Sequence, residues 1–170
     1  MNGIRFTDLT EADFPRLHDW LNRPHLRRFF QKTPISLEGV GAKYDSRLSG
    51  DTATRCHLAW LQAPFGYLQC YRIADFPDWA EIIGESAGIG VDLYIAEPVL
   101  IGRGLGKAML AAYLAEVAFP LFPGEITAWI AHETANAAAK ACSRAVGFTP
   151  AGRFIEDGQP TDLFRLDIIR

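Results

Sequence analysis

The sequence contains little of what marks several large classes of protein. Its three cysteines in 170 residues, Cys56, Cys70 and Cys142, are odd in number and widely spaced, so they form neither a disulfide framework nor a zinc-ligand pattern. No apolar run reaches the length of a membrane span, and the N-terminal residues lack the apolar core of a signal peptide. We therefore expect a cytoplasmic protein with no membrane attachment and no bound metal.

Positive charge is also scarce. The chain has 17 lysine and arginine residues against 20 aspartate and glutamate residues, a formal net charge of −3. A nucleic-acid-binding domain needs a basic face, so this balance argues against a nucleic-acid partner and suits a small cationic one. The length is that of one domain, residues 1–170. Aromatic residues make up 12% of the chain and leave room for a dimer face, so a monomer and a homodimer both remain open.

What the sequence does contain is a glycine-rich turn at its centre. Residues 91–95 are rich in β-branched and aromatic side chains and predict a strand, which Pro98 ends. Residues 101–107 then open an apolar-periodic helix. Such a turn forms an anion cradle, because its free N–H groups and the helix dipole both attract negative charge. Arg103 and Lys107 add two full positive charges.

Two common nucleotide motifs fit this turn poorly. A mononucleotide P-loop places serine or threonine after its Gly-Lys pair, whereas Ala108 follows Lys107 here. A dinucleotide fingerprint needs a third glycine, at the position that Lys107 occupies. Another phosphate-bearing ligand and a tight turn with no ligand remain as the alternatives.

Periodicity along the chain predicts an α+β fold. The elements follow the order β-α-α-(α)-β-β-β-α-β-α-β-β, with strands expected at residues 4–9, 57–61, 66–71, 91–95, 125–131, 148–155 and 162–169. Helices are expected at residues 10–21, 24–30, 36–48, 101–117 and 137–146. Residues 73–87 carry four acidic side chains and no lysine or arginine, which predicts a polar loop that either traps a cation or is only solvated.

Several of these segments resemble one enzyme superfamily. The run from Gly102 to Gly106, followed by a helix, resembles the acetyl-CoA pyrophosphate loop of the GNAT acyltransferases, with Ile101 where glutamine or arginine is usual. The strand Val91-Asp92-Leu93-Tyr94-Ile95-Ala96-Glu97-Pro98 resembles a run of aminoglycoside 6′-N-acetyltransferases. The segments Trp20–His25, Pro64–Tyr71 and Asn136–Phe148 are similar to further runs of the same enzymes.

The resemblance implies the GNAT fold, a mixed and mostly antiparallel twisted sheet of about seven strands with helices on both faces. It also implies acetyl-CoA as co-substrate, with the pyrophosphate on the glycine-rich loop and the pantetheine arm along the strand and beside Asn136. The residues that it assigns to acetyl-CoA binding are Leu93, Tyr94, Ile95, Ile101, Gly102, Arg103, Gly104, Leu105, Gly106, Lys107, Asn136 and Ala139.

Asp92 is the first candidate for the catalytic base. In an alternating strand its side chain faces away from Val91 and Leu93, and a lone carboxylate in an apolar strand is costly without a task or a partner. The resemblance places it at an aspartate that faces the acceptor amine. His132 and Glu133, expected just past a strand end, are alternative bases. A structural aspartate that caps a neighbouring loop is the remaining interpretation.

The resemblance assigns the other reacting group and the acceptor site. Many GNAT enzymes keep a tyrosine at the position of Ser143 to protonate the departing CoA thiolate, and a serine hydroxyl is a weaker acid that could still hydrogen-bond the sulfur through water. The residues expected to bind the acceptor are Trp20, Tyr67, Trp79, Glu81, Glu85 and Asp92, with plain core packing as the alternative for Trp20.

The sequence thus predicts an acetyl-CoA-dependent N-acetyltransferase that acts by direct attack in a ternary complex. The best-fitting acceptor is a cationic small molecule, such as the 6′-amine of an aminoglycoside. Two alternatives stay open: a GNAT enzyme for another amine (a polyamine, a siderophore lysine or a peptide N-terminus), and a non-catalytic acetyl-CoA-binding module.

Overall fold

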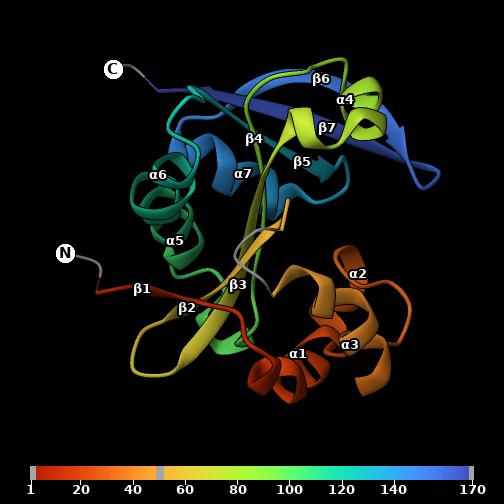
Figure 1. Cartoon of the computed structure of the whole chain (residues 1–170), viewed down its shortest axis with the longest axis vertical. Helices are drawn as coiled ribbons and strands as arrows, with labels where there is room; N and C mark the ends of the chain where they lie inside the picture. Colours follow the sequence, from red (N-terminus) through yellow and green to blue (C-terminus); the bar gives the residue numbers. More distant parts are fainter. Residues whose placement is uncertain (1–2, 49–51, 169–170) are drawn as a thin grey trace.

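A single sheet of seven strands organises the protein. The computed structural model describes residues 3–48 and 52–168, and the strand order in the sheet is β1-β2-β3-β4-β5-β7-β6 (Figure 1). Every neighbouring pair is antiparallel except β4 and β5, which are parallel. The expected mixed, mostly antiparallel sheet is confirmed. The strands are β1 (Arg5–Asp8), β2 (Arg55–Trp60), β3 (Pro64–Arg72), β4 (Ile89–Ile95), β5 (Thr127–Glu133), β6 (Thr149–Glu156) and β7 (Gln159–Asp167).

The helices connect these strands in the expected order, with one addition between β3 and β4 and a further three-residue helix at residues 119–121, beyond the expected helix end at residue 117. They are α1 (Phe14–Leu21), α2 (Pro24–Phe29), α3 (Leu37–Tyr44), α4 (Pro77–Ile83), α5 (Leu105–Tyr113), α6 (Phe119–Leu121) and α7 (Ala137–Val146), and a π-helical turn, Leu114–Ala118, joins α5 to α6. Within the described residues, none of these helices has the length and apolar character needed to cross a membrane.

The added helix, α4, corrects the expectation of a polar loop at residues 73–87. Pro77 begins the helix, where its fixed φ is already helical, and Gly84 ends it in the left-handed conformation with φ 73°. One of its four acidic residues is also neutralised, because Asp75 pairs with Arg72, which lies just before the segment. Of the four acidic residues, Asp78 and Glu81 lie on α4, Asp75 precedes the helix and Glu85 follows it.

Helix caps and the β6–β7 turn are formed by residue types that favour them. Thr10 and Asp13 form a capping pair, with the Thr10 backbone N–H donating to the Asp13 carboxylate at 3.0 Å. Gly147 ends α7 at φ 116°. Asp157 and Gly158 both have positive φ, at 48° and 77°, which is the requirement of a two-residue type I′ hairpin.

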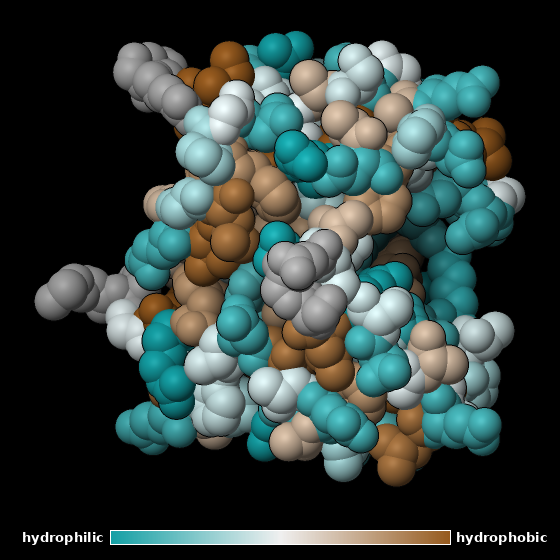
Figure 2. All heavy atoms as spheres, viewed as in Figure 1, coloured by the Kyte–Doolittle hydropathy of each residue, from teal (hydrophilic) through white to brown (hydrophobic). Residues whose placement is uncertain are grey.

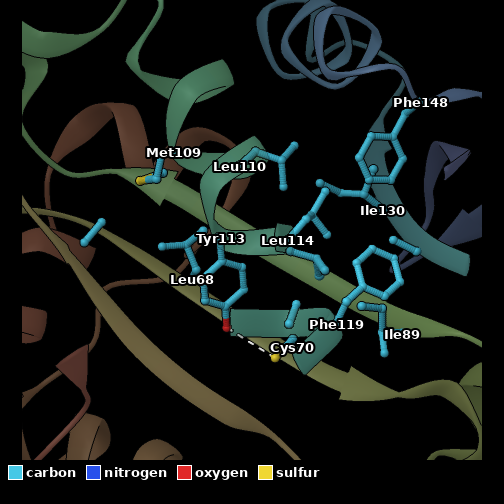
Figure 3. Close-up of a cluster of buried hydrophobic side chains, with 14 of the residues drawn as sticks. Leu68, Cys70, Ile89, Met109, Leu110, Tyr113, Leu114, Phe119, Ile130 and Phe148 are labelled. Carbon is cyan, nitrogen blue, oxygen red and sulfur yellow. Dashed lines mark hydrogen bonds between the residues drawn. The ribbon is translucent and has the colours of Figure 1, made fainter. Parts of the chain in front are cut away.

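Helices cover both faces of the sheet because side chains alternate along the strands. On one face, Leu68 and Val91 pack under α5 and α6 in a core that includes Met109 and Tyr113 (Figure 3). On the other face α1, α2 and α3 pack over one end of the sheet. At the other end of this second face, α4 packs through Trp79 and Ile83. The sheet surface between α4 and the α1–α3 group carries Asp92.

Strands β4 and β5 separate soon after they begin. Their parallel pairing consists of Ile89 with Ala128 and Gly90 with Trp129. Beyond Gly90, β4 continues for five residues paired to β3 alone. One edge of β4 therefore keeps backbone groups that no neighbouring strand uses, in the middle of the sheet.

Candidate active site

The glycine-rich turn lies at the end of β4 and leads directly into α5. Gly102 and Gly104 have φ 77° and 79°, and a Cβ at either would meet nothing within 4 Å. The turn is therefore held by a backbone conformation that other residues rarely adopt, and it is open to the outside. Gly104 is the N-cap of α5, so the first N–H groups of the helix point out of the turn. Among the described residues, no carboxylate pairs with Arg103 or Lys107.

The free edge of β4 is made by Leu93 and Ile95. The Ala96 N–H donates to the Phe65 carbonyl at 2.7 Å, and hydrogen-bonded residues alternate in an antiparallel ladder. Asp92 and Tyr94 therefore direct their backbone groups to β3, whereas Leu93 and Ile95 direct theirs to the side where β5 has departed. Of the three strand residues expected to bind acetyl-CoA, Tyr94 is the one whose backbone is used within the sheet.

Two side chains at the start of α2 hold the end of this edge. His25 Nε2 donates to the Ile95 carbonyl at 3.0 Å, and the Arg23 guanidinium donates to the Ala96 carbonyl at 2.7 Å. Arg23 also pairs with Asp19 and Glu97. Neither residue was expected at the site from the sequence, although both lie in the Trp20–His25 segment.

Asp92 lies on the opposite face from Val91, Leu93 and Ile95, as the strand alternation predicts. Gln69 on β3 is its cross-strand neighbour and donates from Nε2 to Asp92 Oδ2 at 2.8 Å. The Gln69 carbonyl oxygen accepts from the Tyr67 hydroxyl at 2.7 Å and from Arg47 at 3.1 Å. Since both of these partners are donors, the Gln69 amide group is fixed with its NH₂ toward Asp92.

The pKa of Asp92 is raised, chiefly because burial disfavours the charged carboxylate. The Gln69 hydrogen bond and the positive charges of Arg47 and Lys43 act in the opposite direction. In the same way, burial lowers the pKa of Lys43, and Asp92 partly restores it. Gln69, Arg47 and Lys43 were not expected near Asp92, because a neighbouring strand and a segment distant in the sequence supply them. The sequence signal for this arrangement was Gln69, a polar residue within an otherwise apolar strand.

A small pocket of about 10 Å³ opens beside Asp92 at the point where β4 and β5 part. That is about the space of one water molecule. Trp79 of α4 lines it together with Tyr71 and Trp129, and Trp79 packs edge-on against Phe154 at 5.4 Å. The structure thus brings Trp79 and Asp92, both expected at the acceptor site, to one place. Figure 2 shows the surface hollowed at its right edge, between the α4 end and the α1–α3 end.

Other residues expected at the acceptor site lie elsewhere. Trp20 and Tyr67 are 2% and 0% exposed in the aromatic core under α1–α3, so neither side chain presents a surface to an acceptor. Glu81 is exposed on α4 and lies about 200° around the helix from Trp79, on the side away from the sheet. Glu85 is half-buried just after the helix ends.

Ser143 on α7 is bonded to His132 on β5. Ser143 Oγ and His132 Nε2 lie 2.8 Å apart, and Ser143 is 1% exposed. Burial and the charge of Lys140 lower the pKa of His132 to about 4, so the imidazole is neutral at pH 7. The hydroxyl expected to serve the thiolate is therefore enclosed and already has a partner.

The two alternative bases face opposite sides of the sheet. His132 and Glu133 are the last two residues of β5, rather than loop residues past its end. His132 follows Ala128 and Ile130 in alternation and points toward α7. Glu133 follows Trp129 and Ala131, which line the pocket beside Asp92. Of the two, Glu133 shares the face of Asp92.

Asn136 begins α7 and caps it. Its side-chain oxygen accepts from the Ala139 N–H at 3.3 Å, which leaves the Asn136 NH₂ group for another partner. Near the start of α5, a Cβ on Gly106 would come within 3.2 Å of Cys142 Sγ on α7. The two helices therefore approach closely where the glycine-rich turn ends. No group of three or more His, Cys, Asp or Glu side chains in the described part of the chain is arranged to hold a metal.

Comparison with known proteins agrees with this architecture. The acetyltransferase (GNAT) domain family matches residues 9–155, and the chain belongs to that family. Two curated relatives are aminoglycoside N(6′)-acetyltransferase type 1 from Klebsiella pneumoniae and from Serratia marcescens, each 29% identical over 115 residues. These matches cover 65% of this chain and 57% of each relative, so the chain aligns with little more than half the length of either.

Solved structures with the same fold include aminoglycoside acetyltransferases. The structure of AAC(6′)-Ib with paromomycin and acetyl-CoA has a TM-score of 0.84 at 24% identity and covers 97% of this chain and 93% of its own. AAC(6′)-Ib with coenzyme A and kanamycin has a TM-score of 0.83 at 24% identity, with 96% and 94% covered. A spermidine N-acetyltransferase chimera from Vibrio cholerae and hSSAT has a TM-score of 0.74 at 14% identity, with 97% and 95% covered.

Proposed function

We propose that the protein transfers the acetyl group of acetyl-CoA to a primary amine of a cationic small molecule, the 6′-amine of an aminoglycoside or a similar compound. The observation that carries the proposal is Asp92, a carboxylate held by Gln69 beside the pocket where β4 and β5 part. The names of the curated relatives support the choice of acceptor.

The residues present fit acetyl-CoA. The open cradle at Gly102 and Gly104, with the start of α5 behind it, suits a pyrophosphate. The free edge of β4 at Leu93 and Ile95 suits the amide groups of a pantetheine arm, which could pair with it as an added strand does. Bound there, acetyl-CoA supplies an activated acetyl thioester.

Asp92 then acts on the acceptor amine. Its carboxylate binds the ammonium group and accepts a proton from it, so that the free amine can attack the thioester carbonyl carbon. Asp92 passes this first proton to solvent. A C–N bond forms, the C–S bond breaks, the sulfur leaves as thiolate, and the nitrogen gives its second proton to Asp92. The raised pKa of Asp92 makes it a stronger base than an exposed aspartate.

The test is acetyl-CoA-dependent thiol release with kanamycin, tobramycin, a 6′-hydroxyl analogue of kanamycin, spermidine and lysine derivatives. Turnover of kanamycin but not of its 6′-hydroxyl analogue is expected. Turnover of spermidine alone would replace the aminoglycoside by a polyamine. Asp92→Asn should abolish turnover and leave binding of acetyl-CoA unchanged, and an unchanged rate would remove Asp92 as the base.

A second function, a non-catalytic acetyl-CoA-binding module, is favoured by Ser143. Its hydroxyl is enclosed and paired with His132, so it does not serve the leaving thiolate in this arrangement. The thiolate of CoA is a tolerable leaving group without protonation, and catalysis therefore survives this loss. Binding of acetyl-CoA with no thiol release on any amine of the panel would select the module.

A further inference from the structure

Lys32 and Glu133 form an ion pair between the helical group at one end of the sheet and the end of β5. Lys32 follows α2, in the helical group at one end of the sheet, whereas Glu133 is the last residue of β5. Their ammonium and carboxylate groups are in direct contact, with the side chains 46% and 20% exposed. The pair joins two segments that are 101 positions apart in the chain.

Glu133 belongs to the same surface as the pocket. Alternation along β5 places it on the side of Trp129 and Ala131, which line the pocket with Asp92. On β6 the same argument places Glu156 on the side of Phe154, whose ring contacts Trp79. Three carboxylates, Asp92, Glu133 and Glu156, therefore lie on one face of the sheet, and Lys32 pairs with one of them.

The electrostatics agree with this placement. Burial raises the pKa of Glu156, the charges of Asp92, of the adjacent Asp157 and of Glu133 raise it further, and Lys32 lowers it. Each of these charges therefore acts on Glu156, as expected if the three carboxylates and Lys32 surround a common space.

We propose that Lys32 is a built-in competitor of the acceptor: its ammonium pairs with Glu133 in the free protein, and a second ammonium group of a polycationic acceptor displaces it. This inference rests on the proposed function for the location of the acceptor. The exchange breaks one ion pair, forms another and changes no covalent bond.

The consequence is a selectivity that depends on the number of amines. An acceptor with a single ammonium at Asp92 leaves Lys32 in place. A polycation gains Glu133 as a partner but must release Lys32 first, which reduces its net affinity. Lys32 thus moderates binding of polycations without touching the reacting atoms.

The test compares Lys32→Ala and Lys32→Met, which keeps the apolar stem, with wild type by equilibrium binding and by steady-state kinetics. The probes are kanamycin, with several amines, and 6-amino-6-deoxyglucose, with one. Both variants should bind kanamycin about three- to fivefold more tightly, the scale of a half-exposed ion pair, and lower its KM equally with kcat unchanged. The hexose should show no change.

Arg28→Ala is the matched control. It removes the same charge from an exposed residue of α2 whose guanidinium lies over the Phe29 ring, and among the described residues no carboxylate pairs with it. Glu133→Gln should weaken kanamycin binding, and adding Lys32→Ala to it should bring no further gain. A gain for Arg28→Ala equal to that of Lys32→Ala would show a general charge effect and overturn the inference.

The remaining outcomes separate the two proposals. If wild type acetylates kanamycin but the Lys32 variants bind it no better, the inference fails and the proposed function stands. If wild type acetylates nothing yet the Lys32 variants bind kanamycin more tightly, the proposed function fails and the inference stands. If kanamycin neither binds nor reacts, both are overturned.

Discussion

Gln69 donates a hydrogen bond to Asp92 across the β3–β4 pair, at 2.8 Å, and its own carbonyl oxygen is held by Tyr67 and Arg47. A buried carboxylate that has one fixed donor is both oriented and kept closer to its ionised form. Gln69 is thus a positioning residue for the proposed base.

Replacing Gln69 by alanine removes the hydrogen bond that lowers the pKa of Asp92. The carboxylate must be ionised to accept a proton, so the acidic limb of the pH profile of kcat/KM should move to higher pH, with kcat about tenfold lower at neutral pH. Gln62→Ala, at the exposed tip of the β2–β3 hairpin, is the control. A profile that keeps its acidic limb after Gln69→Ala would contradict the positioning role.

His132 should make the protein less stable in acid. Its pKa is about 4 in the folded protein and about 6.5 when unfolded, so between these values the unfolded chain binds more protons. Stability should therefore fall as pH decreases from about 6.5 to about 4, with a slope of up to about 1.4 kcal/mol per pH unit. Urea unfolding of wild type and His132→Asn across this range measures the effect. The free energy of unfolding should depend less steeply on pH in the variant.

His57 provides the internal comparison for that experiment. Burial lowers its pKa too, so some dependence on pH should remain in His132→Asn and decrease further in the double variant His57→Asn/His132→Asn. Equal slopes in wild type and the double variant would show that neither imidazole is the source.

Gly104→Ala should weaken acetyl-CoA binding. A left-handed alanine at φ 79° costs about 1 kcal/mol, and relaxing that strain would move the N–H groups of the cradle. Gly124→Ala is the control, because Gly124 also has open space around it but no positive φ. We expect a several-fold higher KM for acetyl-CoA in the first variant and wild-type behaviour in the second, and equal KM values would argue against the cradle.

Gly90→Ala should disturb the pocket from within the sheet. A Cβ there would lie 2.3 Å from the ring of Tyr71, its cross-strand neighbour, so the ring must leave the pocket lining. A loss of about 1–3 kcal/mol in the free energy of unfolding is expected from such overpacking. Gly41→Ala, in open space on α3, should instead be neutral or stabilising by up to about 1 kcal/mol.

The parts of the site that lie within one segment could be predicted from the sequence. The strand before Pro98, the turn at Gly104 and α7 with its cap at Gly147 are set by local rules of strands, glycine and helix ends, and all are confirmed. The placement of Asp92 opposite Val91 also follows from alternation alone.

Contacts between distant segments could not be predicted in this way. The pairing of Gln69 with Asp92 depends on the register of β3 against β4, and that of Lys32 with Glu133 on where α2 lies over the sheet. The enclosure of Trp20 could not be predicted either, because an amphipathic helix does not reveal whether its tryptophan faces a core or a cleft. Ser143 acquires its partner only through the crossing of β5 and α7.

The early parting of β4 and β5 means that this sheet carries an edge in its interior, where most proteins have none. His25 occupies the Ile95 carbonyl, but within the described residues no strand pairs with the Leu93 backbone or the Ile95 N–H on this side. A ligand that lies along it would complete the sheet, so the folded state and the bound state are thermodynamically linked. Thermal stability of this protein should accordingly rise with ligand concentration, and a melting curve can then report occupancy before any turnover is measured.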